Sequence, residues 1–198
     1  MAFSGLPEWK KATDLLEAER EWSLEQPAPR EGGSGLSPLA RGSIYHRCLE
    51  DFSSSGTYDL PTVAGEFPEF RALSADGRGR FLEDAASRLA ALTENEELAW
   101  IFRNHPGTYA ELPFLLRRGS EIISGMIDRV VVKDGTGYVI DYKSIAVGSS
   151  EDLQAWIAHY RPQVRVYCEA VKELFGVEAA EGYLLFLDSG RLALTAKI

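Results

Sequence analysis

The sequence predicts an α/β fold of the α+β kind, in which a mixed sheet is flanked by helices. Two observations predict this class. Helical spacing of apolar residues dominates the first half of the 198 residues, whereas runs of β-branched and aromatic residues between turn residues dominate the second half. One further helical segment divides these runs into two groups, which gives the order helices, strands, helix and strands.

The first 40 residues are predicted to form a unit of their own. Residues 8–24 place two tryptophans and two leucines on a loose apolar stripe, which predicts an amphipathic helix. Residues 25–40 are rich in proline, glycine and serine, which predicts a linker. We therefore divide the chain into an N-terminal helix with a linker, residues 1–40, and a main domain, residues 41–198.

Helices open the main domain. Residues 43–52 carry aromatic and leucine side chains at the spacing i, i+4 and i+7, which predicts a short helix. A stretch rich in serine, glycine and proline separates it from a second helix over residues 79–92. A further helical segment is expected around residues 95–103.

Five strands and one helix are predicted for the rest of the chain. Runs of β-branched and aromatic residues bounded by turn residues predict the strands. The helix is expected to be interrupted at Arg161-Pro162, because proline disfavours helical backbone at the residue before it. The strands are residues 108–116, 121–132, 138–145, 182–187 and 192–197, and the helix is residues 152–175.

The second and third predicted strands form a hairpin that carries three charged residues. If the Asp-Gly pair of the segment KDGTG is a two-residue loop, Asp128 lies directly across from Asp141. Opposed residues have Cβ atoms roughly 4.5–5.5 Å apart. Lys143, two residues beyond Asp141, points to the same face. A four-residue loop would place Asp128 opposite Lys143 and would still leave all three on one face.

Apolar residues surround these charges on both predicted faces of the hairpin. The face of the charges also holds Met126, Val130, Val132 and Val139, and the other face holds Ile127, Val131, Ile140 and Tyr142. Strands that are apolar on both faces are buried on both faces, where carboxylates are costly unless they are paired or bound to metal. One interpretation is a buried Asp–Lys ion pair, which would leave the second carboxylate uncompensated. The other is a site for Mg²⁺ or Mn²⁺, which favour oxygen ligands.

A metal site here would support phosphodiester hydrolysis. A cation held by Asp128 and Asp141 can polarise a phosphate and lower the pKa of a bound water. Lys143 can orient or deprotonate that water and stabilise the charge of the transition state.

The pattern D-x12-D-x-K, carried by GMIDRVVV and VIDYKS, resembles the core of the PD-(D/E)xK nuclease superfamily. Within it the chain most resembles the RecB/AddA-type (exonuclease V-like) nuclease domain of bacterial helicase–nucleases. Three further segments carry this narrower resemblance in the same order, over roughly residues 41–187: GSIYHRCLEDF, ELPF and HYRPQVRVYCEAV. The resemblance implies a restriction-endonuclease-like fold.

The resemblance also implies site residues. Lys143 is implied to be catalytic, together with both aspartates. The implied metal ligands are His46, Asp128, Asp141 and the main-chain carbonyl of Tyr142. The implied auxiliary or DNA-contacting residues are Glu111, Gln163 and Tyr167.

The residues alone leave alternatives open for several of these positions. A lone histidine such as His46 is more often structural or on the surface. Glu111 can be a water-mediated metal contact or a partner for an arginine. Gln163 and Tyr167, one helical turn apart, can be ordinary helix surface and core. The other two histidines, His105 and His159, match no motif and are expected to face solvent.

The implied function is an Mg²⁺-dependent DNA exonuclease or endonuclease, with Mn²⁺ able to substitute, working beside a helicase in double-strand-break processing and recombination. The expected partners are DNA, single-stranded at the active site, and a helicase domain or subunit, of which residues 1–40 could be a remnant. The alternatives are a stand-alone nuclease of the same superfamily and a catalytically idle scaffold that binds DNA or a partner.

Composition limits these expectations. A net charge of −9 opposes a DNA-holding surface, so either the acidity faces away from DNA or a partner delivers the strand. Two distant cysteines cannot build an iron–sulfur cluster, and no phosphate-loop motif for ATP occurs. No apolar window is long enough to span a membrane, and a cytoplasmic location is expected.

Overall fold

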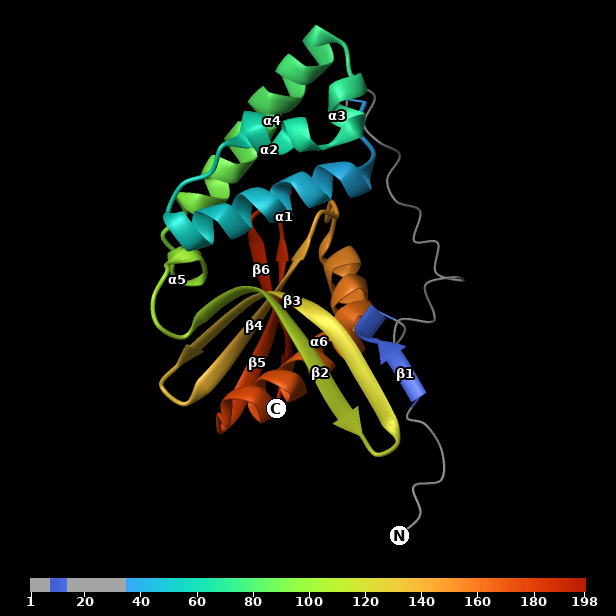
Figure 1. The fold of residues 1–198 in the computed structure, drawn as a ribbon, viewed down its shortest axis with the longest axis vertical. Coiled ribbons are helices and arrows are strands. Elements are labelled where there is room, and N and C mark those ends of the chain that lie inside the picture. The colour runs from blue at the N-terminus through green and yellow to red at the C-terminus, as the bar shows by residue number, and fades with distance from the viewer. Residues whose placement is uncertain (1–7, 14–34) are drawn as a thin grey trace.

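A computed structural model describes residues 8–13 and 35–198 of the protein. Its elements in chain order are β1 (Glu8–Lys11), α1 (Pro38–Ser55), α2 (Leu60–Glu66), α3 (Pro68–Ala72), α4 (Ala75–Thr93), α5 (Ala99–Phe102), β2 (Thr108–Arg118), β3 (Glu121–Lys133), β4 (Thr136–Lys143), α6 (Ser150–Phe175), β5 (Ala179–Phe186) and β6 (Arg191–Lys197). One mixed sheet lies between the layer α1–α5 and the long helix α6 (Figure 1). The predicted α/β class is confirmed. Within the described part of the chain, no helix is both long and apolar enough to cross a membrane.

Strand β3 organises the sheet because it has three partner strands. Strand β2 pairs antiparallel along almost the whole of one edge. The other edge is shared, since β1 pairs in parallel with residues 121–124 and β4 pairs antiparallel with residues 129–133. Strand β5 follows in parallel with β4, and β6 completes the sheet. Residues 125–128 therefore face a gap in the described sheet, between the ends of two ladders.

The β3–β4 hairpin has the predicted two-residue loop. Lys133 pairs with Thr136, and the intervening Asp134 and Gly135 have φ angles of +51° and +74°. Positive φ at both central residues is the type I′ geometry, which matches the twist of the strands on either side. The predicted register is therefore confirmed.

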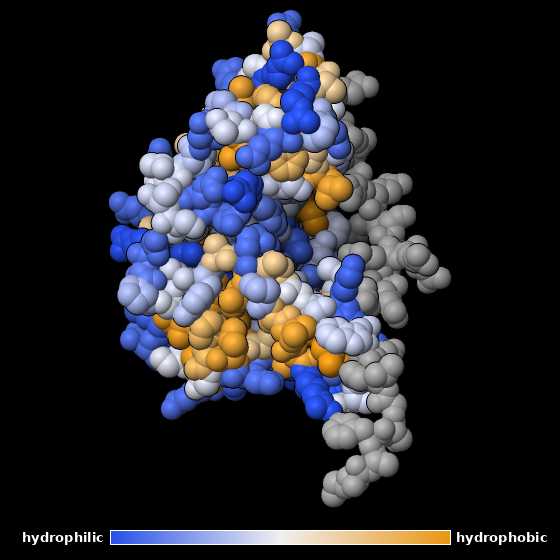
Figure 2. All heavy atoms as spheres, viewed as in Figure 1, coloured by the Kyte–Doolittle hydropathy of each residue, from blue (hydrophilic) through white to orange (hydrophobic). Residues whose placement is uncertain are grey.

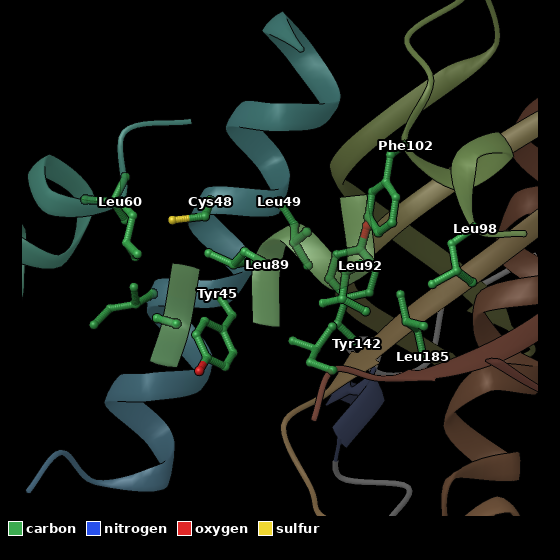
Figure 3. Close-up of a cluster of buried hydrophobic side chains, with 14 of the residues drawn as sticks. Tyr45, Cys48, Leu49, Leu60, Leu89, Leu92, Leu98, Phe102, Tyr142 and Leu185 are labelled. Atoms are coloured by element: carbon green, nitrogen blue, oxygen red, sulfur yellow. The ribbon is translucent and has the colours of Figure 1, made fainter. Parts of the chain in front are cut away.

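Both faces of the sheet are buried, as the apolar strands predicted. One hydrophobic cluster joins the layer α1–α5 to the sheet face that carries Val131 and Tyr142. Figure 3 shows side chains of α1 and α4 packed beside Tyr142 and Leu185. A second cluster joins α6 to the face of Val130 and Val139. Each buried leucine or phenylalanine contributes about 1.5–3 kcal/mol, so the strands that carry the site are anchored from both sides.

The regular alternation of faces is broken at Glu111 and Asp128. Tyr109 and Phe114, both in β2, contact α6 through Phe175 and Tyr167 respectively. Residues five apart in an uninterrupted strand point to opposite faces, so β2 changes face between them. Glu111 lies in this interval with φ +46°, at the register position opposite Asp128.

The same change of face in β3 corrects two predicted positions. Ile127 was expected to face away from Val130, but both pack in the cluster against α6. Met126, expected on the buried face of the charges, is 46% exposed. The predictions assumed an unbroken pleat. The irregularity at Asp128 places the side chains of Met126 and Ile127 on the faces opposite to those predicted.

The prediction of a helix over residues 8–24 is wrong at its start, because Glu8–Lys11 form strand β1. Residues 8–11 extend the sheet by pairing with the free N-terminal end of the β3 edge. Trp9 is 63% exposed and does not belong to an apolar stripe. Tertiary pairing thus overrides the weak helical pattern. The rest of that prediction, and the linker up to residue 34, lies outside the described residues.

The helical layer is longer than predicted. Helix α1 begins at Pro38, with the Ser37 side chain accepting a hydrogen bond from the Ala40 N–H group. Helices α2 and α3 occupy the stretch for which no element was predicted, and each has a proline in its first turn. The predicted interruption at Pro162 is wrong, because α6 is continuous. Proline leaves the Ala158 carbonyl without its helical donor, but Ala158 is exposed and water can replace it.

The close contact between α6 and β5 depends on a glycine. An added Cβ at Gly182 would lie 2.2 Å from Val164 Cγ1 and 2.8 Å from Cys168 Sγ. We expect Gly182→Ala to lower the free energy of unfolding by about 1–3 kcal/mol through overpacking. Gly79→Ala in α4, where nothing lies within 4 Å, should instead raise it by about 0.5–1 kcal/mol. Urea denaturation measures both, and equal effects would contradict the packing described.

Candidate active site

Asp128 lies where β3 and β4 separate. Their ladder ends at the pair Arg129–Ile140, and beyond it the Tyr142 N–H group donates a hydrogen bond of 2.6 Å to Asp128 Oδ2. The carboxylate side chain thus takes the place of a main-chain acceptor. The N–H and C=O groups of one strand residue point to the same side, so the Tyr142 carbonyl also faces the gap. Its role as a metal ligand stays a prediction.

Asp141 and Lys143 lie together on the α6 face of β4. Lys143 Nζ is 2.7 Å from Asp141 Oδ2, and their side chains are only 15% and 6% exposed. The Lys143 ammonium also lies 4.0 Å from the ring centroid of Tyr160 on α6. Tyr142, between them in sequence, packs into the cluster on the opposite face.

His46 and Glu111 approach Asp128 from α1 and β2. His46 Nδ1 is 3.5 Å from Asp128 Oδ1, and the His46 ring packs edge-on against Tyr142 with centroids 5.4 Å apart. One ligand atom each from His46, Glu111 and Asp128 lie within 4.8 Å of one another. Asp141 is not a member of this compact group, and its carboxylate pairs with Lys143. Both alternatives for Glu111 stay predictions, because it lies in this group and Arg47 is also among the charges that act on it.

Residues close to His46 in the sequence hold helix α1 in place. Tyr45 and Leu49 are buried in the helical cluster, which leaves His46 at the edge of the helix that faces the sheet. The histidine is therefore positioned by core packing.

A pocket of about 450 Å³ opens this group to solvent. Its lining includes His46, Glu111 and Arg47, with Ser43 of α1 and Ser144 after β4. In Figure 2, hydrophilic side chains gather in the middle of this face, over the place where α1 crosses the sheet. A charged substrate group can thus reach His46 and Glu111.

The two aspartates have opposite pKa shifts. Burial raises the pKa of Asp128, but His46, Lys143 and the Tyr142 N–H group outweigh it and lower the pKa overall. Burial also raises the pKa of Asp141, and the repulsion from Asp128 adds to this, so its pKa stays raised despite Lys143. One lysine therefore does not compensate both carboxylates.

The acids raise the pKa of both basic groups. Burial lowers the pKa of Lys143, but Asp141, Tyr160 and Asp128 together raise it by more, so the pKa lies above its usual value. Burial likewise lowers the pKa of His46, and Asp128 with its acidic neighbours reverses the shift. The pKa of Glu111 is raised by burial and by Asp128. A divalent cation among these groups would relieve the repulsion.

Gln163 and Tyr167 lie beneath the site and are buried. They are 3% and 4% exposed, and Gln163 Nε2 donates a hydrogen bond of 2.9 Å to the Tyr167 hydroxyl. This placement favours the auxiliary role over a direct contact with DNA, and both roles stay predictions. His105 and His159 are half-buried, so neither simply faces solvent as expected.

Sequence reasoning missed two residues of the site. Arg129 is 2% exposed and donates hydrogen bonds to the carbonyls of Ile101 at 2.7 Å and Arg103 at 3.0 Å, which fixes β3 beside Asp128. The sequence feature that could have identified Arg129 is its position as an arginine inside an apolar strand. Tyr160, under Lys143, lies one helical turn before Gln163, and that spacing was its signal.

The family follows from a comparison of sequence. The model of the PD-(D/E)XK nuclease superfamily matches residues 11–195. The chain belongs to this superfamily. Its D-x12-D-x-K hairpin is the segment on which Asp128, Asp141 and Lys143 meet, so the resemblance described above is confirmed at the level of the family.

Among curated proteins, this superfamily member is similar to one of the subunits of the ATP-dependent helicase/nuclease of Staphylococcus aureus. Identity is 33% over 117 residues for strain JH9 and for strain NCTC 8325 / PS 47. The match covers 50% of this chain and 10% of those relatives, so the chain spans about a tenth of their length.

Among solved structures, this superfamily member is similar in fold to a protein from Eubacterium rectale for which an exonuclease function has been suggested. The TM-score is 0.52 at 13% identity, over 79% of this chain and 59% of the other.

The superfamily's use of divalent metals suggests a pH test. Binding of Mn²⁺ is expected to weaken as pH falls, because a protonated imidazole cannot be a ligand. The raised pKa of His46 places the start of this loss at a higher pH than for an ordinary histidine. Isothermal titration at several pH values measures it, and His46→Asn should flatten the dependence. An unchanged dependence in that variant would exclude His46 as a ligand.

Proposed function

We propose that this chain is an Mg²⁺-dependent deoxyribonuclease that hydrolyses phosphodiester bonds as an exonuclease or endonuclease. One observation carries the proposal. The buried carboxylate of Asp141, its half-buried partner Lys143 and the half-buried carboxylate of Asp128 lie around the gap where β3 and β4 separate.

The donor set suits a hard divalent cation. Asp128, Glu111 and His46 supply two carboxylates and an imidazole within a small group, and Asp141 adds a carboxylate from the neighbouring strand. Oxygen-rich sites of this kind select Mg²⁺ or Mn²⁺, and a protein that held only a structural Asp–Lys pair would have no use for the other acids. We therefore propose His46, Asp128, Asp141 and the Tyr142 carbonyl as ligands, with Glu111 beside them.

Each protein group has a separate task in hydrolysis. The bound cation would polarise the phosphate and lower the pKa of the attacking water. Lys143, held over the Tyr160 ring and beside Asp141, places a positive charge where negative charge grows on the phosphate oxygens. Asp128 is fixed by the Tyr142 N–H group and so needs little reorganisation on binding.

We further propose that the domain works as part of a helicase–nuclease in double-strand-break processing and recombination. The similarity to a helicase/nuclease subunit supports this partner. The net charge of −9 agrees with it, since a motor that feeds the strand would relieve this domain of holding DNA by its phosphates. A cytoplasmic location is part of the same proposal.

End-labelled DNA tests the activity. Single-stranded and double-stranded oligonucleotides are incubated with the protein in Mg²⁺, in Mn²⁺ and in EDTA. We expect fragments of the single strand with either metal and none in EDTA. Absence of metal-dependent cleavage of both substrates, together with no heat of Mn²⁺ binding at millimolar metal, would instead support the idle scaffold.

A further inference from the structure

The pocket at the candidate active site follows one side of helix α1. Its lining runs from Pro38 through Gly42 and His46 to Glu50, a spacing of four residues that keeps to one helix face. A helix rises 1.5 Å per residue, so this side of the pocket extends over about 18 Å. A duplex carries one phosphate per about 3.4 Å of each strand, so the pocket is long enough for more phosphates than the one that is cut.

Arg47 supplies a positive charge to this pocket that the proposed chemistry does not use. Among the described residues that line the pocket, Arg47 alone is an arginine or a lysine. Burial raises the pKa of Glu111 overall, and the positive charges of His46 and Arg47 oppose this shift. The Arg47 guanidinium therefore acts on the candidate site, although Arg47 is not one of the proposed metal ligands.

The acidic partners of Arg47 hold it loosely. Arg47 Nη1 is 3.4 Å from Glu50 Oε2, and Arg47 Nε is 3.5 Å from Asp51 Oδ1, both on the same helix. A charge-assisted hydrogen bond from an arginine is shorter, about 2.7–2.9 Å. The Arg47 side chain is exposed, and exposed pairs of this kind contribute little to stability. A phosphate can therefore displace these two carboxylates.

Support of the helix alone is the other explanation for these pairs. Arg165 and Glu169 on α6 form a pair with the same i, i+4 spacing and the same distance of 3.5 Å, and neither residue lines this pocket. Such a pair supports its own helix and needs no ligand. Arg47 differs in its position, because it lines the pocket together with His46 and Glu111.

We propose that Arg47 binds a phosphate of the DNA strand next to the phosphate that is cut, and that Glu50 and Asp51 hold the guanidinium until the strand binds. This inference rests on the proposed function and adds a substrate-positioning residue to it. The planar fork of an arginine matches two phosphate oxygens as well as two carboxylate oxygens, so the exchange keeps the geometry of binding. In a chain with a net charge of −9, this contact attracts the strand only where it must lie for cleavage.

The salt dependence of DNA binding tests this role without cleavage. A short labelled oligothymidylate is titrated with the protein in EDTA at several concentrations of KCl, and fluorescence anisotropy measures the binding constant. Arg47→Gln removes the charge, Arg47→Lys keeps it, and Arg165→Gln is the matched control because it removes the same kind of pair away from the pocket. Thermal unfolding of each variant monitors the fold.

We expect Arg47→Gln to weaken binding roughly 10-fold at low salt. The slope of the logarithm of the binding constant against the logarithm of the salt concentration should become shallower by about 0.7, the value for one lost contact with a single strand. Arg165→Gln and Arg47→Lys should keep the slope of the wild type, because the charge at the pocket remains. Equal slopes in Arg47→Gln and the wild type, or no binding by the wild type at low salt, would overturn the proposal.

Asp51→Asn tests whether the carboxylates compete with the strand. Asp51 does not line the pocket, and its replacement removes one partner of Arg47. We expect binding to become about 2-fold tighter, since the energy of an exposed helical pair is no longer lost. The gain should disappear when Arg47→Gln is also present. An equal gain with and without Arg47 would show that only the general charge matters and would contradict the competition.

Cleavage of the same strand by the wild type in Mg²⁺ separates this inference from the proposed function. If the wild type cleaves but Arg47→Gln keeps the wild-type salt slope, the role of Arg47 is wrong and the nuclease proposal stands. If the wild type does not cleave but Arg47→Gln has the shallower slope, the nuclease proposal is wrong and the pocket binds DNA without cutting it.

Discussion

Replacing Lys143 with methionine is expected to slow cleavage of single-stranded DNA by about 10²–10⁴-fold. Methionine keeps the length and apolar stem of lysine, so packing against the Tyr160 ring survives while the charge beside Asp141 is lost. Single-turnover cleavage at saturating metal measures the chemical step. Mn²⁺ affinity should change far less, because an ammonium is not a ligand.

Lys133→Met is the matched control for this variant. Lys133 lies in the same hairpin, beside the turn, and its side chain is exposed. It should cleave like the wild type. Full activity in Lys143→Met would contradict a catalytic role for the ammonium, and equal losses in both variants would show that charge on the hairpin, and not position, is what matters.

Replacing Asp141 with asparagine is expected to abolish cleavage without destabilising the metal-free protein. Burial and Asp128 raise the pKa of this carboxyl above its unfolded value, so its ionised form costs stability at neutral pH. Asparagine removes that cost, and Lys143 can still interact with Asp128. Thermal unfolding in EDTA at neutral pH should give an unfolding temperature equal to the wild type or higher.

The same variant separates the two interpretations of the buried charges. A structural Asp–Lys pair that loses one partner costs about 3–5 kcal/mol, because the other charge stays buried without compensation. A metal site that loses one of several repelling acids does not incur this cost. A large fall in the unfolding temperature of Asp141→Asn would therefore identify the pair as structural and argue against the metal site.

The hairpin was predictable because its turn is a local signal. An Asp-Gly pair fixes a two-residue loop, and the loop fixes which residues face each other up to the pair Arg129–Ile140. The common face of Asp141 and Lys143 therefore followed from the sequence, whereas Asp128 lies beyond the end of that ladder. Burial on both faces followed from the apolar runs that contain them. His46 was different, since only the family resemblance distinguished it from a surface histidine.

The rest depended on contacts between distant segments. Strand β1 forms because one end of the β3 edge is not paired with β4, and no sequence pattern within residues 8–11 predicts this pairing. The change of face at Glu111 and Asp128 leaves no mark in the apolar pattern, although it brings Glu111 beside His46. Arg129 is explained only by the two carbonyls of the α5 region that accept its hydrogen bonds.

Titration of Mn²⁺ into the wild type and Asp128→Asn would test most directly whether the acids of the two strands hold one cation. Asp134→Asn, in the turn of the same hairpin, serves as the control for charge alone. We expect one binding site in the wild type and in the control, and an affinity more than about 100-fold weaker in Asp128→Asn, beyond the range of an outer-shell partner. Identical isotherms for all three proteins would contradict the cation site on which the nuclease assignment depends.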